Sequence, residues 1–96
     1  MQPLEHANPE LYSILREELA PYHLHSFDVQ ASGAASHDDF TIVLKYGDRL
    51  SYSKEKSFSQ HMIMEKDEDI RKFFRSAGDD IKKALISDYF KMMKNE

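Results

Sequence analysis

Residues 39–46 have the sequence DFTIVLKY, and this stretch decides the fold. Large apolar side chains occupy every second position, and successive side chains of a strand point to opposite faces. The alternation predicts a strand from Asp39 to Tyr46 with one face in the core. That face carries Phe40, Ile42, Leu44 and Tyr46, and the other carries Thr41, Val43 and Lys45.

The next strand is predicted from Arg49 to Lys56, after a turn at Gly47-Asp48. Two loop lengths compete. A two-residue turn would place Leu50 and Tyr52 on the face opposite the large apolar residues. A three-residue loop, in which Tyr46 faces Leu50, would gather all the large side chains on one face. We favour the odd-length loop for that reason.

The flanking segments are less regular. Upstream, an alternation of apolar and polar residues predicts a strand from about Leu24 to Ala31, and the small residues Ser32 to Ser36 predict a loop. Downstream, Ser57 to Met64 fits either a fourth, edge-like strand or a helix. We favour a short extended segment because the acidic run Asp67-Glu68-Asp69 is typical of a new helix start.

An N-terminal helix is predicted by the capping chemistry of Asn8-Pro9-Glu10. Asn8 offers an oxygen to a free N–H group, and the proline and glutamate suit the first helical turn. Apolar residues then recur on one face until Pro21 stops the helix at Ala20. Residues 1–7 precede the cap, and we expect them to be flexible.

Residues Asp67 to about Lys94 have helical periodicity but two apolar stripes. The earlier stripe runs from Ile70 to Ala84, and at about 100° per residue the later one is centred well around the helix from it. Either Ser76-Ala77-Gly78 breaks the segment and Asp79 caps a second helix, or one long helix carries two apolar faces. We favour the break.

Together these elements predict one α+β domain over residues 1–96. It would consist of an N-terminal helix, a three- to four-stranded antiparallel sheet, and one or two C-terminal helices packed on one sheet face. The sequence contains no internal repeat and no interdomain linker.

Composition excludes several classes of function. The chain has 96 residues, 41% of them hydrophobic, and a formal net charge of −4. Scattered basic residues and net negative charge argue against a nucleic-acid partner. The sequence has no cysteine, which excludes disulfides and thiolate chemistry and indicates a cytoplasmic location. The N-terminus does not resemble a signal peptide, and no apolar stretch is long enough to cross a membrane.

The candidate metal ligands are His23, His25, His37 and Asp39, because imidazole and carboxylate groups together suit zinc and similar divalent ions. Spacing alone does not bring these residues together, and the favoured interpretation is surface or strand-end histidines. Other polar groupings match no catalytic motif, and three widely separated glycines cannot form a phosphate loop. The sequence therefore predicts no catalytic residue, no cofactor and no known small-molecule ligand.

The C-terminal segment is apolar around most of its circumference, which is unusual for a helix with one core to pack against. It could lie wedged between the sheet and the first helix, pack on the sheet and a protein partner, or lie on a membrane; its acidic residues disfavour the last. The predicted interface residues are Leu85, Ile86, Tyr89, Phe90, Met92 and Met93.

The resulting functional hypothesis is a non-enzymatic protein-interaction or assembly module. It would be a homodimer that uses the C-terminal helix or a sheet edge. The alternative is a small metal-dependent enzyme or metal binder centred on the strand histidines.

Overall fold

The computed structural model describes residues 1–25 and 28–94, and the side chains of residues 1–25 and 28–90. Its strands are β1 (Gln2–Pro3), β2 (Val29–Ala35), β3 (Asp39–Tyr46) and β4 (Tyr52–Ser59). Its α-helices are α1 (Leu4–Ala7), α2 (Pro9–Leu19), α3 (Gln60–Glu65) and α4 (Glu68–Lys94), and its 3₁₀ turns are η1 (Ala20–Tyr22) and η2 (Asp48–Leu50).

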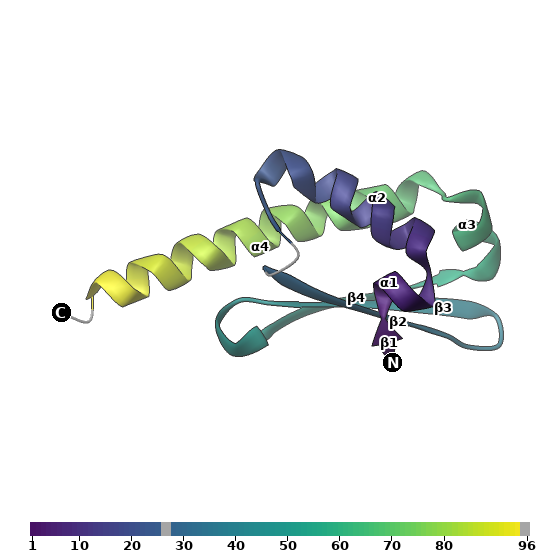
Figure 1. The fold of residues 1–96 in the computed structure, drawn as a ribbon, viewed down its shortest axis with the longest axis horizontal. Coiled ribbons are helices and arrows are strands. Elements are labelled where there is room, and N and C mark those ends of the chain that lie inside the picture. The colour runs from purple at the N-terminus through teal and green to yellow at the C-terminus, as the bar shows by residue number, and fades with distance from the viewer. Residues whose placement is uncertain (26–27, 95–96) are drawn as a thin grey trace.

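The four strands form one antiparallel sheet in the order β1-β2-β3-β4. Figure 1 shows α2 and α4 on one side of this sheet. The α+β class predicted from the sequence is therefore confirmed, as are the N-terminal helix and the C-terminal helical segment on one sheet face. The fourth strand is β1, which comes from the N-terminus.

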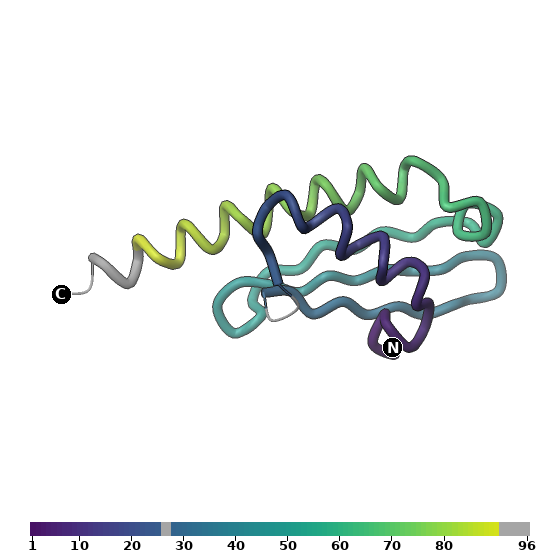
Figure 2. Tube along the Cα trace, turned by 45° about the horizontal axis from the view of Figure 1, so that its top comes forward, coloured from purple at the N-terminus to yellow at the C-terminus, as the bar shows by residue number. Residues whose placement is uncertain are grey.

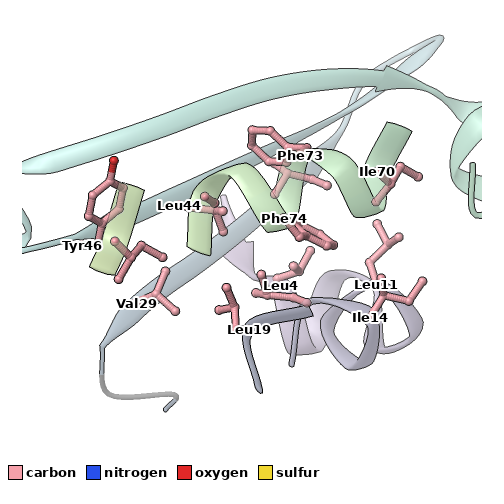
Figure 3. Close-up of a cluster of buried hydrophobic side chains, with 14 of the residues drawn as sticks. Leu4, Leu11, Ile14, Leu19, Val29, Leu44, Tyr46, Ile70, Phe73 and Phe74 are labelled. Atoms are coloured by element: carbon pink, nitrogen blue, oxygen red, sulfur yellow. The ribbon is translucent and has the colours of Figure 1, made fainter. Parts of the chain in front are cut away.

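The core fills the space between the sheet and the helices, where apolar side chains from both layers point toward one another (Figure 3). The predicted inward face of β3 is buried, as is the apolar face of α2. Asn8 caps α2 as expected, because its side chain accepts a hydrogen bond from Leu11 N at 3.2 Å. Buried residues of α4 complete the layer: Ile70, Phe73, Phe74, Ala77, Ile81 and Ala84.

The first long strand begins later than the sequence predicts. The predicted strand was Leu24 to Ala31, but β2 begins at Val29, and residues 26 and 27 of the predicted strand lie outside the described residues. Just before β2, Asp28 N donates to His25 O and Asp28 Oδ2 accepts from His25 N. The predicted loop Ser32 to Ser36 is also wrong, since β2 continues to Ala35. Small residues are needed there because a Cβ on Gly33 would lie 2.7 Å from Phe40 Cζ.

The β3–β4 connection has the predicted parity but not the predicted length. Tyr46 pairs with Tyr52, so five residues connect the strands and the odd-length prediction is confirmed. The predicted partner of Tyr46, Leu50, instead lies in η2 with a φ of 54° and is exposed. The loop also contains positive φ angles at Gly47 and Arg49, and it is longer than the predicted three-residue loop.

Residues 57–64 divide between two elements. Ser57 to Ser59 complete β4, and α3 begins at Gln60, so the favoured extended segment is wrong for its second half. Ser59 ends the strand and caps the helix, because its hydroxyl accepts a hydrogen bond from Met62 N at 3.2 Å.

The predicted break at Ser76-Ala77-Gly78 is also wrong, because α4 is one helix of 27 residues. Its acidic start is as expected: Asp67 Oδ1 accepts from Asp69 N at 2.9 Å. Gly78 is present for packing rather than for termination. A Cβ at this position would lie 2.7 Å from Tyr22 Cε2 and 3.2 Å from Leu19 Cδ2, so the glycine lets η1 approach α4 closely.

Residues 1–7, which the sequence predicts to be flexible, form β1 and α1 in the structure. Gln2 and Pro3 pair with β2, and the Leu4 side chain is fully buried in the core. The sequence offers little warning of this, since a single leucine carries the contact.

An ion-pair cluster joins α2 to α4 on the helical surface. Glu18 accepts hydrogen bonds from Arg75 Nε at 2.6 Å and from Arg71 Nη1 at 2.9 Å, and its side chain is only 14% exposed. The hydrogen bond from Arg75 lowers the pKa of Glu18, and the hydrogen bond from Arg71 lowers it further. Partial desolvation acts in the opposite direction, but the pKa stays below its usual 4.5. Glu17 shares Arg71 at 3.3 Å but is 64% exposed.

We expect Glu18→Gln to lower the free energy of unfolding by about 1 kcal/mol at neutral pH. Because the folded pKa is depressed, the carboxylate stabilises the fold above its unfolded pKa, and this contribution is lost as pH falls through the folded value. Urea unfolding of both proteins at neutral and acidic pH measures the difference, which should shrink in acid. Glu17→Gln is the control and should cost less; equal effects of the two variants would contradict the assignment.

Candidate protein-interaction surface

The C-terminal part of α4 projects past the sheet, and the views in Figures 1 and 2 agree on this. A helix of 27 residues is about 40 Å long, whereas a strand of eight residues such as β4 spans about 26 Å. The sheet therefore cannot cover the whole helix. The last described turns of α4 lie beyond the layer of side chains that buries the first half of the helix.

Three large apolar side chains are exposed on this projecting end. Ile86 is 48% exposed, Tyr89 61% and Phe90 56%, and these three residues are called the distal patch below. Tyr89 and Phe90 contact edge-to-face, with ring centroids 6.1 Å apart. They are three of the six interface residues predicted from the sequence.

The other predicted interface residues differ in placement. Leu85 is half-buried and packs against the core, so only part of it is available to a partner. The side chains of Met92 and Met93 lie outside the described part of the structure. Of the predicted interface residues whose side chains are described, Ile86, Tyr89 and Phe90 are thus the exposed ones, and they lie on one side of the helix.

Helical geometry explains why the distal patch faces away from the core. With Ile81 taken as the centre of the buried side, Tyr89, Ile86 and Phe90 lie roughly 80–180° around the helix. Ala84 and Ala77 remain on the buried side. One continuous helix therefore carries both apolar faces, which is the alternative to the break that the sequence left open.

The β3–β4 hairpin lies beside the projecting end of α4. Asp48 N donates a hydrogen bond to Asp88 Oδ2 at 3.0 Å, which brings η2 to the helix. Leu50 and Tyr52 in this hairpin are exposed apolar residues at the same end of the molecule. The sequence missed them as surface residues because the shorter predicted loop directed both inward.

Polar contacts join α4 to η1 and to β4 near the distal patch. Lys82 Nζ donates to Tyr22 O at 3.1 Å, and Lys54 Nζ pairs with Asp80 at 2.9 Å. Burial raises the pKa of the Tyr46 hydroxyl, and the Asp80 carboxylate raises it further. Tyr46 therefore stays neutral and packs as an aromatic, stacked on Tyr52 at 5.7 Å.

The candidate metal ligands occupy opposite ends of β2. His23, in a left-handed conformation after η1, and His25 precede the strand, whereas His37 and Asp39 follow it. The six residue steps of the strand separate the pairs by about 20 Å. The structure does not bring the four together, and within residues 1–25 and 28–94 it contains no group of three or more His, Asp or Glu side chains that could hold a metal.

Comparisons with protein-family models, curated proteins and solved structures find no match to this chain. In the described part of the chain, none of the helices combines the length and the apolar character needed to cross a membrane.

Proposed function

We propose that this protein is a non-enzymatic interaction module that assembles into a homodimer through the distal patch of α4. The observation that supports the proposal is the exposure of Ile86, Tyr89 and Phe90 on a helix end that the sheet does not cover. Burying such side chains against a second surface removes them from water and lowers the free energy of the system. The lack of cysteine supports a cytoplasmic location for this assembly.

The size of the distal patch supports a weak dimer. A fully buried aromatic side chain removes roughly 150–250 Å² from water, so the three residues together present on the order of 350 Å². Patches of about 300–600 Å² on a monomer are often functional. Two copies would bury on the order of 700 Å² of patch, less than the roughly 1,200–2,000 Å² of a standard interface. We expect Leu50 and Tyr52 to add area and the affinity to be micromolar.

The exposed edge of β4 is less suited to self-association. This strand ends the sheet, and its centre is Lys54-Glu55-Lys56. If two β4 strands paired antiparallel around Glu55, Lys54 of each copy would lie opposite Lys56 of the other, and the two Glu55 side chains would face each other. Like charges in direct opposition destabilise a strand pair, and edge lysines disfavour such contacts. We therefore favour the helix over the sheet edge.

The metal-dependent alternative has no comparable support. Its four candidate ligands lie in two pairs about 20 Å apart, beyond the reach of one coordination sphere. No second function is proposed.

The test is to substitute Phe90→Lys and measure the monomer–dimer equilibrium by sedimentation. Burying a lysine in the contact without a partner of opposite charge should weaken dimerisation at least about tenfold. Because Phe90 is exposed within the monomer, the urea midpoint at a concentration where both proteins are monomeric should not change. Ile86→Lys, at the other end of the distal patch, should have the same effect.

Met64→Lys is the matched control, since Met64 is exposed on α3, outside the distal patch. This variant should dimerise like the wild type. A wild-type chain that stays monomeric at several hundred micromolar, or equal weakening by Met64→Lys, would overturn the proposal.

A further inference from the structure

We infer that the two copies pair their α4 helices antiparallel, across a two-fold axis that passes close to Ile86. The inference rests on the proposed function and specifies the partner surface: each distal patch packs against the stretch of the partner's α4 that includes Lys82 and Lys83. A two-fold contact uses the same surface on both copies and closes at two, as expected for a homodimer.

The order of side chains along α4 favours this direction. Lys82 and Lys83 are exposed one turn before Ile86, and Tyr89 and Phe90 are exposed one turn after it. In a parallel pair, residues of equal number would lie side by side, so the four lysines of two copies would cluster. Like charges at such short range destabilise helix pairs. A parallel arrangement is therefore disfavoured.

In an antiparallel pair centred on Ile86, each lysine lies level with an aromatic ring. Position 82 is level with the partner's Phe90, and position 83 is level with the partner's Tyr89, since both pairs are symmetrical about 86. Lysine stems cover apolar surface while the ammonium remains in water, and an ammonium near an aromatic face is attracted to it. The same residues that repel in a parallel pair thus become complementary.

The neighbouring element η1 limits where the partner helix can lie. It packs against α4 at Gly78, and Tyr22 O accepts a hydrogen bond from Lys82. The side of α4 that carries the distal patch becomes free only beyond this contact. Ile86 is one turn past Lys82, about 6 Å along the axis, so a crossing point near Ile86 places the partner's distal patch level with residues 82–86, starting at the edge of the η1 contact.

The experiment uses the absence of native cysteine, which makes every introduced thiol the only one in the chain. Ile86→Cys, Lys82→Cys and Phe90→Cys variants are oxidised mildly at concentrations above their dissociation constants, and the rate of covalent dimer formation is measured. A disulfide requires Cα atoms within about 7 Å, so only residues near the axis can pair with their own copies. Ile86→Cys should cross-link at least tenfold faster than either other variant alone.

A mixture of Lys82→Cys and Phe90→Cys chains should form mainly the mixed disulfide, because these positions are level in the antiparallel pair. Ser57→Cys, exposed on the open face of the sheet, gives the background rate. Similar rates for all three helix variants would indicate a parallel pair and overturn the inference. Background rates at all three, with a dimer still present by sedimentation, would overturn the inference and also place the contact outside α4. A wild-type chain with no dimer by sedimentation would overturn the proposed function itself.

Discussion

Leu4→Ala is expected to lower the free energy of unfolding by about 2–5 kcal/mol, the range for removing a fully buried leucine. Leu4 is completely buried although it lies in a helical turn only four residues from the N-terminus. Its Cδ1 atom lies close to Gly33, where a Cβ would be 3.1 Å away. Alanine would leave a cavity between α1 and the sheet that this short segment can close only in part.

Urea or thermal unfolding measures the loss, and Glu5→Ala is the control. Glu5 follows Leu4 in the same turn but is exposed, with only a 3.9 Å contact to His6. The control should change stability by less than about 0.5 kcal/mol. If Leu4→Ala behaved like Glu5→Ala, residues 1–7 would contribute nothing to the core, and the flexible N-terminus predicted from the sequence would be correct after all.

Gly78→Ala is expected to destabilise the protein by about 1–3 kcal/mol, the usual range for overpacking. The sign is the informative part, because in an unobstructed helix the same substitution raises stability by about 0.5–1 kcal/mol. The new Cβ would lie 2.7 Å from Tyr22 Cε2 and 2.8 Å from Tyr22 Cδ2. The aromatic ring would have to move, and η1 would lose its close contact with α4.

A double-mutant cycle separates the two effects. In a Tyr22→Ala background the obstructing ring is absent, so Gly78→Ala should become neutral or stabilising. Ser76→Ala, at an exposed position of the same helix, reports helix propensity alone. A stabilising Gly78→Ala in the wild-type background would show that η1 does not pack on α4 as described.

Local chemistry made a large part of the fold predictable from the sequence. The alternation in residues 39–46 determined β3 and its inward face, and Asn8 determined the start of α2. The parity of the β3–β4 connection followed from the need to unite apolar side chains. Each of these features depends on residues that are close in the sequence. The periods of the strand and the helix determine from their spacing which side chains point in the same direction.

Three of the failures involve contacts between different secondary-structure elements. Small residues at 32–36 resemble a loop, but Gly33 is small because the Phe40 ring lies over it. Gly78 resembles a helix end, but it is small because Tyr22 packs against it. Leu4 resembles part of a tail until its partners are known. In each case the residue type is explained by a tertiary contact, and the neighbouring sequence does not reveal that contact.

The candidate surface was partly predictable for the same reason. A helix with more apolar residues than one core can cover must expose some of them, and Ile86, Tyr89 and Phe90 are the ones exposed. The sequence could not show that the hairpin would bring Leu50 and Tyr52 to the same end, because that depends on the loop between β3 and β4.

The projecting end of α4 has one further consequence. Short helices without tertiary support are only marginally stable in water. The first half of α4 obtains that support from the sheet, whereas within the subunit the last described turns have the half-buried Leu85 and the Asp48–Asp88 hydrogen bond. If the proposed dimer forms, association would add support to these turns, and the population of helix there would rise with the concentration of the protein.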